Sequence, residues 1–161
     1  MGTAEKLRSY VSILTERSVR LKDIGKKLIE MLQRERFDDL LPEVEHRQSV
    51  IDSYQDCLQR CISELKAADY AFDEETILPF LLKLADSEAA YSDIKKPLLE
   101  LKQVIEETRS QEKKLLKMVS NLPNTIRQRL IEVQVQKNGI SAYQRTLSSP
   151  LAEFHRFERK K

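Results

Sequence analysis

The stretch FDDLLPEVEHR, at positions 37–47, decides how the chain folds. An aspartate side chain accepts hydrogen bonds from the free N–H groups of a first helical turn, and proline is tolerated only near such a start. We therefore expect Asp39 to cap a helix that carries Pro42 in its first turn. Phe37 is placed to pack back on that turn, as a hydrophobic staple does. The stretch predicts a tight turn followed by a new helix.

The residues before this turn repeat with a period of seven. Arg17 alone breaks the pattern, and charged residues fill the positions between the apolar ones. The pattern predicts one helix of about 30 residues, ~45 Å long, that ends near Arg36. Its apolar positions are Leu7, Tyr10, Leu14, Leu21, Ile24, Leu28 and Met31.

The same period continues after the turn, which predicts a second long helix. A short connection between two long heptad helices makes them antiparallel neighbours. The apolar positions of the second helix are Val44, Ile51, Tyr54, Leu58, Cys61 and Leu65.

Three further elements are expected downstream. Residues 69–76, which contain an acidic run, predict a loop, and ILPFLLKLADSEAAY at 77–91 predicts a short helix of one to four turns. Asp93 with Pro97 begins another long helix. Pro123 removes one internal hydrogen bond, but the heptad phase survives it, so we expect a kinked helix or two nearly coaxial ones. The phase is kept by Val119, Ile126, Val133, Ile140 and Leu147.

These elements predict an all-α fold, an antiparallel bundle of three to four long heptad-patterned helices plus short ones. At 161 residues the chain is long enough for one domain, which we place at residues 1–148. Residues 149–161 are expected to form a short C-terminal helix or a mobile tail, with Ser149 capping and Pro150 in the first helical position.

Composition argues against several classes of function. The net charge is only +2, and no dense basic stripe appears, so no nucleic-acid partner is expected. No apolar run approaches the ~20 residues of a membrane-spanning helix, so no membrane insertion is expected. Cys57 and Cys61 lie one helical turn apart, where a disulfide would strain the helix. A reducing, cytoplasmic location is the simple interpretation.

The patterns of catalytic and metal-binding residues are incomplete. Glu43 and His46 have the spacing found in di-iron bundles, but the second such pair is absent, since Ala152 precedes His155 by three residues. No further Cys or His completes a zinc site around the two cysteines. We therefore expect no metal, no cofactor and no enzymatic activity, and we expect the chain to bind other proteins through its helical surfaces.

Two patches resemble a known family. RERFDDLLPEVEHRQSVIDSY, at 34–54, looks like the junction between helices 1 and 2 of the FliT/FlgN-like flagellar export chaperones. Gln136, Lys137, Ile140 and the run Ser141-Ala142-Tyr143 resemble the end of the substrate-handling helix in FliT-type proteins. The coarse likeness spans residues 5–147, in which residues 70–95 look like an insertion.

The resemblance implies a cytoplasmic chaperone of type III flagellar export. Such a protein holds the terminal helices of a filament-cap or hook-junction subunit and delivers that subunit to the cytoplasmic domain of the export gate. In this family a tyrosine near the chain end helps to dock on the gate, and Tyr143 is the matching position. The heptad phase also places Tyr143 at a core position, so packing and docking remain open alternatives. A monomer or weak homodimer is expected.

The helix-in-groove mode of recognition needs an apolar groove, which the C-terminal segment is expected to cover when the groove is empty. The expected partner-binding residues are therefore Gln136, Ile140, Tyr143, Leu147, Leu151, Phe154 and Phe157. The alternative is a structural coiled-coil adaptor unrelated to secretion, which predicts a stable homodimer with its apolar seams buried between chains.

Overall fold

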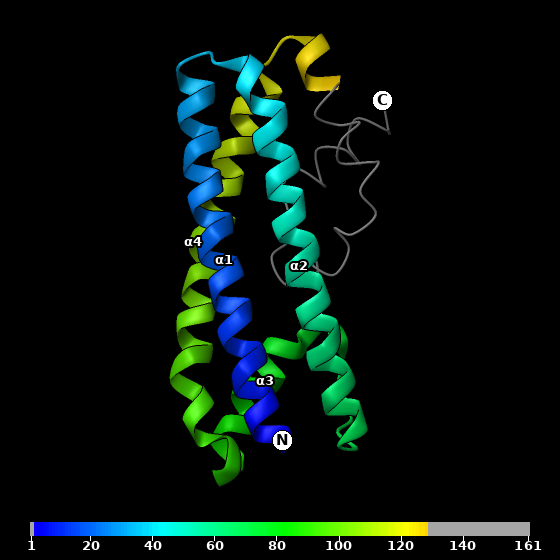
Figure 1. The fold of residues 1–161 in the computed structure, drawn as a ribbon. Coiled ribbons are helices and arrows are strands. Elements are labelled where there is room, and N and C mark those ends of the chain that lie inside the picture. Colours follow the sequence, from blue (N-terminus) through cyan, green and yellow to red (C-terminus); the bar gives the residue numbers. More distant parts are fainter. Residues whose placement is uncertain (1, 129–161) are drawn as a thin grey trace.

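The computed structural model describes residues 2–128, and these residues form an all-α fold without strands (Figure 1). The predicted fold class is confirmed. The long helices are α1 (Thr3–Gln33), α2 (Leu40–Ala67) and α4 (Lys95–Ser120), with a shorter α3 (Ile77–Ser87) between the last two. Three 3-10 turns lie in the connections: η1 (Phe37–Asp39), η2 (Glu74–Thr76) and η3 (Ala89–Ile94).

Helices α1 and α2 form the expected antiparallel hairpin, and α4 returns on the other side of α1. Ion pairs between the helices show the direction of α2 and of α4 relative to α1. Lys6 pairs with Glu64 near one end of the hairpin and Lys27 with Glu43 near the other, as antiparallel helices require. Arg8 with Asp93 and Lys22 with Glu107 instead keep a nearly constant sequence offset, so α1 and α4 run in the same direction. Helix α3 makes this possible by crossing the lower end of the bundle (Figure 1).

Helix α1 is central because it carries two adjacent buried stripes. Its backbone packs along both α2 and α4, whereas α2 and α4 scarcely approach each other. One stripe is the predicted leucine series, and the other begins one turn later with Val11 and includes the small residues Ser18 and Gly25. Small side chains let two helices lie close together. Arg17, which interrupts the heptads, donates to Ser53 Oγ on α2 at 2.8 Å.

The turn between α1 and α2 differs in detail from the prediction. Helix α1 ends at Gln33, and Glu35 takes a left-handed conformation with φ 56°. The N–H of Arg36 then donates to the carbonyl of Met31 and that of Glu35 to the carbonyl of Leu32, a Schellman arrangement. Asp39 does occupy the N-cap position of α2, but its carboxylate accepts from the Arg36 guanidinium at 2.7 Å and caps nothing.

At the lower end of the bundle, aromatic side chains from the segment that connects α2 to α4 pack against one another. Tyr70 meets Phe80 and Tyr91 edge-on, at ring-centroid distances of 5.9 and 6.3 Å, and Phe72 stacks on Phe80 at 4.9 Å. The hydroxyl of Tyr70 donates to Glu88 at 2.7 Å. The predicted loop over 69–76 therefore contains ordered structure, and its aromatic residues fix α3 against the start of α4.

At the upper end, the helix of α4 stops at Ser120, before Pro123. Helical backbone resumes over residues 124–128, in which the Arg127 N–H donates to the Pro123 carbonyl. Leu122 is buried, and Ile126 packs against the core. The proline therefore ends one helix before the next turn begins, and the rest of the predicted helix lies outside the described residues.

Candidate partner-binding clefts

The residues that the sequence predicts for partner binding all lie beyond residue 128. Gln136, Ile140, Tyr143, Leu147, Leu151, Phe154 and Phe157 are therefore outside the described residues, and so is the proposed cover of the groove. The described helices nevertheless contain three clefts that sequence reasoning missed, because each depends on which helix faces are neighbours.

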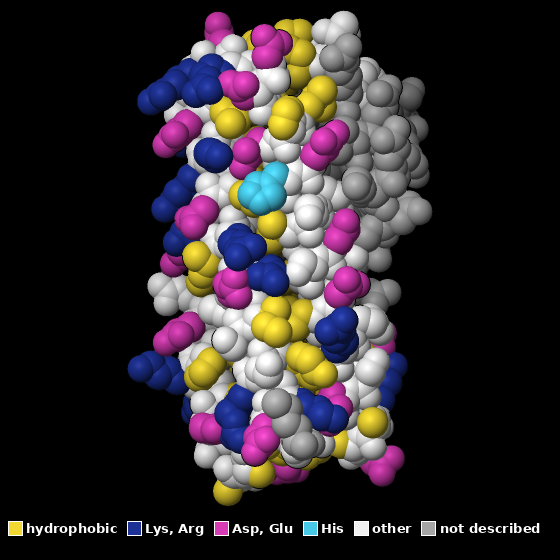
Figure 2. Space-filling view, in the orientation of Figure 1, with side chains coloured by type: hydrophobic (Ala, Val, Ile, Leu, Met, Phe, Trp, Pro, Cys, Tyr) yellow, Lys and Arg dark blue, Asp and Glu magenta, His cyan; other side chains and the backbone are white. Residues whose placement is uncertain are grey.

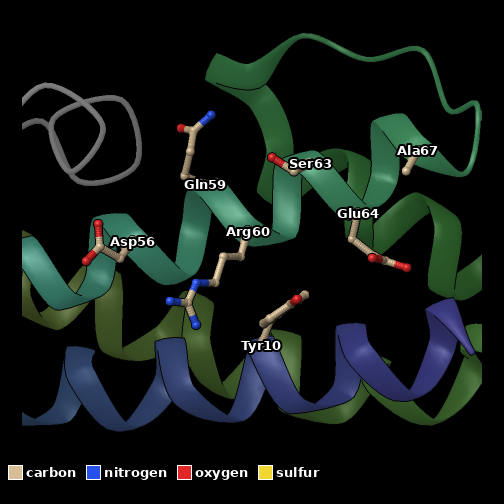
Figure 3. A pocket seen from close by; sticks show the side chains of 7 residues that line it. All are labelled: Tyr10, Asp56, Gln59, Arg60, Ser63, Glu64 and Ala67. Atoms are coloured by element: carbon tan, nitrogen blue, oxygen red, sulfur yellow. The ribbon is translucent and has the colours of Figure 1, made fainter. Parts of the chain in front are cut away.

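The cleft between α1 and α2 is the most polar of the three (Figure 3). It encloses about 630 Å³ and is open to solvent. Tyr10 projects from α1 toward the α2 side chains, which are mostly charged or amide groups, and Arg60 points down toward α1 (Figure 3). Such a lining suits hydrogen bonding more than apolar anchoring. The lining residues are Tyr10, Asp56, Gln59, Arg60, Ser63, Glu64 and Ala67.

The cleft between α3 and α4 is smaller, about 250 Å³, and has an apolar floor. Leu78 and Pro79 come from the start of α3 and Ile105 from α4. Two carboxylates and two basic groups stand around this floor, so the rim carries both signs of charge. Small-molecule sites usually exceed ~300 Å³, so this volume suits an anchoring side chain of a partner better. The rim residues are Glu75, Lys102, Glu106 and Arg109.

The third cleft lies on the seam between α1 and α4 and encloses about 470 Å³. Ile94 and Pro97 line it together with hydroxyl and charged side chains, and the Arg8–Asp93 ion pair borders it. The molecular face in Figure 2 shows the same alternation of basic, acidic and apolar side chains. No single sign of charge dominates that face.

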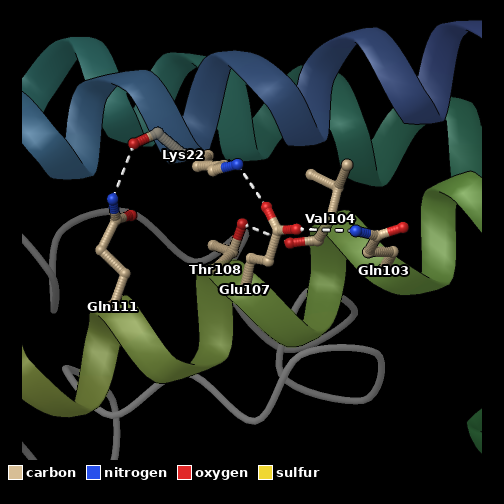
Figure 4. A network of polar contacts seen from close by, with 6 residues as sticks. All are labelled: Lys22, Gln103, Val104, Glu107, Thr108 and Gln111. Carbon is tan, nitrogen blue, oxygen red and sulfur yellow. Dashed lines mark hydrogen bonds and ion pairs between the residues drawn. The ribbon is translucent and has the colours of Figure 1, made fainter.

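A polar network holds α1 against α4 above this cleft (Figure 4). Lys22 pairs with Glu107, and Gln103 donates to the same carboxylate at 3.1 Å. The hydrogen bond from Lys22, followed by that from Gln103, lowers the pKa of Glu107 below its usual 4.5. One turn further, Gln111 Nε2 donates to the backbone carbonyl of Lys22 at 2.9 Å. This network fixes the register of the two parallel helices.

A buried ion pair joins α2 to α4. Arg47 donates to the Glu112 carboxylate, and each side chain is at most 2% exposed. Both residues occupy heptad positions that a core residue normally fills: Arg47 precedes Tyr54 by seven, and Glu112 stands between Ile105 and Val119 in a series spaced by seven. That spacing is the sequence signal that would have identified the pair.

The residues considered for metal binding, Glu43, His46, Cys57 and Cys61, all lie on α2. His46 lies 3.5 Å from Glu43 on an exposed part of α2. Cys57 and Cys61 are free and buried, and burial raises the pKa of their thiols to about 11 and about 12. Over the described part of the chain, no group of three or more His, Cys, Asp or Glu side chains is placed to hold a metal ion.

No helix within residues 2–128 is long and apolar enough to cross a membrane. In the comparisons with known proteins, no family model matches the chain, and neither does any curated protein or solved structure. The likeness to flagellar export chaperones therefore rests on the sequence patches alone.

Proposed function

We propose that the protein is a cytoplasmic flagellar export chaperone that binds a terminal helix of a filament-cap or hook-junction subunit and delivers it to the export gate. The observation that carries the proposal is the α1–α2 junction. Residues 34–54, on which the family resemblance rests, form the turn and the first half of α2 in a long helical hairpin. A long hairpin of this kind offers the extended surface that a helical export substrate needs.

The α3–α4 cleft is the described surface that suits helix-in-groove recognition best. An amphipathic helix anchors through a few apolar side chains, and the floor formed by Leu78, Pro79 and Ile105 accepts such anchors. Charged groups of both signs at the rim, among them Lys102 and Glu106, are placed to fix the orientation of the bound helix.

The test is calorimetric titration of the purified protein with the C-terminal helical segment of the host's filament-cap protein. We expect 1:1 binding in the micromolar range or tighter. Leu78→Ser should weaken that binding about tenfold, a loss of about 1.4 kcal/mol. Leu99→Ser is the matched control, because Leu99 is 48% exposed on α4 and does not line the cleft. If neither the filament-cap nor the hook-junction segments bind, the proposal is wrong.

Two further variants address the sequence-predicted docking residues. Tyr143→Ala should leave the protein folded and abolish its binding to the cytoplasmic domain of the export gate. A large fall in melting temperature would instead identify Tyr143 as a core residue. Deletion of residues 149–161 should raise affinity for the export substrate, because Leu151, Phe154 and Phe157 are proposed to cover the groove. Unchanged or weaker binding after the deletion would remove that idea.

The alternative function, a coiled-coil adaptor, requires apolar seams that are shared between chains. In the described helices the heptad residues of α1 are instead buried within one chain: Leu7, Leu14 and Leu21 are at most 1% exposed. This favours a monomer or weak dimer. Light scattering after size exclusion measures the mass directly, and a stable homodimer at low micromolar concentration would favour the adaptor.

A further inference from the structure

The solvent side of α4 carries six exposed lysines. Glu107 and Gln111, which bond to Lys22, mark the side of α4 that meets α1. At 3.6 residues per turn, the six lysines lie further round the helix, within about one third of its circumference. We call them the lysine row, and they are Lys95, Lys96, Lys102, Lys113, Lys114 and Lys117.

The carboxylates of α4 leave most of this row unbalanced. Glu107 forms an ion pair with α1 and Glu112 with α2, whereas Glu100 lines the cleft between α1 and α4. Among residues 2–128, Lys95 alone of the row forms an ion pair, with Asp86 at 2.6 Å. The other ammonium groups are therefore available to an anionic partner, although the net charge of the whole chain is only +2.

Two other exposed residues within the row indicate which kind of anionic partner fits. Leu99 is 48% exposed and suits a partner that brings an apolar side chain of its own. Glu106 interrupts the positive charge, so it repels a uniformly negative surface such as a lipid bilayer or duplex DNA. A protein helix can place a basic side chain opposite Glu106 and acidic side chains opposite the lysines. The pattern therefore favours a helix.

We propose that the lysine row is a docking surface for an acidic amphipathic helix of a partner protein. The bound helix lies along α4 and sets an apolar side chain on Leu99, while its carboxylates pair with the lysines. The row extends over 22 positions, from Lys95 to Lys117, which corresponds to about 33 Å of helix. This surface goes beyond the proposed export function and does not depend on it.

Two designed peptides test the proposal on the full-length protein. Both are amphipathic helices of about 22 residues, the length of the row, with the same leucines. One carries glutamates beside the leucines and the other carries lysines. Fluorescence anisotropy of the labelled peptides should show binding of the acidic peptide alone, and added NaCl should weaken it because salt screens exposed charges. Equal binding of the two peptides, or no binding of the acidic one, would overturn the proposal.

Substitutions locate the binding on α4. Lys113→Gln combined with Lys117→Gln should weaken binding of the acidic peptide about fivefold, because two exposed ion pairs are lost. The matched control, Arg20→Gln with Arg60→Gln, removes the same two positive charges from exposed positions on α1 and α2 and should leave the affinity unchanged. Equal effects of the two double variants would show that net charge, rather than the row, decides binding.

Glu106→Gln provides a test with the opposite sign. It should strengthen binding of the acidic peptide, because it removes the one carboxylate within the row. Weaker binding would contradict the proposed position of the helix. Far-UV circular dichroism checks that each variant keeps its helices.

Two other polyanions are outcomes of the same test. If phosphatidylserine vesicles or duplex DNA bind more tightly than the acidic peptide, and the substitutions at Lys113 and Lys117 weaken that binding, the helical partner is wrong. The export function is tested separately. If the filament-cap segment binds and the acidic peptide does not, only this inference fails; if the acidic peptide binds and neither export segment does, only the proposed function fails.

Discussion

Gly25 on α1 faces the Gln111 side chain of α4, and the coupling between these two residues gives a testable prediction about stability. A Cβ atom added at Gly25 would overlap the Gln111 carboxamide. That carboxamide is the far end of a flexible side chain, so in Gly25→Ala it can rotate away. The rotation breaks the hydrogen bond from Gln111 Nε2 to the Lys22 carbonyl.

Two opposing terms then decide the stability of Gly25→Ala. Alanine is favoured over glycine in a helix interior by about 1 kcal/mol. The lost hydrogen bond costs about 0.5–1.5 kcal/mol. The two terms nearly cancel, so the free energy of unfolding of Gly25→Ala should stay within about 1 kcal/mol of the parent protein.

In a Gln111→Ala background, the hydrogen bond and the overlap are both absent. Gly25→Ala should then stabilise the protein by about 1 kcal/mol, which is roughly 2–4 °C in melting temperature for a chain of this size. Urea unfolding of the four proteins in this double-mutant cycle gives the coupling energy, expected near 1 kcal/mol.

The control is Gln103→Ala, which removes another glutamine from α4 that bonds to Glu107 and lies away from Gly25. It should show no coupling to Gly25→Ala. If Gly25→Ala has the same effect with and without Gln111, the steric argument is refuted.

Three other substitutions test separate features of the bundle. Glu112→Gln should lower the free energy of unfolding by about 3–5 kcal/mol, because it removes the negative charge that pairs with the buried Arg47 guanidinium, whereas Arg47→Met combined with Glu112→Leu should recover most of that loss in urea unfolding. Because the pKa of Glu107 is lowered in the folded state, its contribution is complete above pH 4.5 and is lost as the pH falls through the folded pKa. The stability difference between the parent and Glu107→Gln should therefore be present at pH 7 and shrink in acid, and a pH-independent difference would contradict this reasoning. Glu35→Gly should raise the melting temperature, because glycine adopts the left-handed conformation of this position without the ~1 kcal/mol cost borne by other residues, and an unchanged or lower value would count against strain there.

Much of the helical architecture was predictable from the sequence. The heptads of the first two helices and the turn at Phe37 led directly to the α1–α2 hairpin, because a seven-residue period with a short connection permits few arrangements. The role of Asp39 was predicted wrongly. Its spacing from Pro42 suits a cap, but the neighbouring Arg36 guanidinium competes for the same carboxylate.

The clefts were not predictable in the same way. The lining of the α3–α4 cleft joins Leu78 to Ile105, and which helix faces are neighbours depends on the crossing of α3 at the lower end. The parallel direction of α1 and α4 also depends on the crossing of α3 at the lower end of the bundle. Arg47 and Glu112 did carry a signal, since both stand in apolar heptad positions, but charge alone suggested a solvated helix face.

The central place of α1 also has a consequence for the order of folding. Its contacts with α2 join residues 16–58 positions apart, and those with α4 join residues 85–89 positions apart. Shorter loops close at lower entropic cost and faster. The α1–α2 hairpin is therefore the unit that can assemble first as the chain leaves the ribosome, and it presents its second stripe, with Ser18 and Gly25, as the template on which α4 later docks.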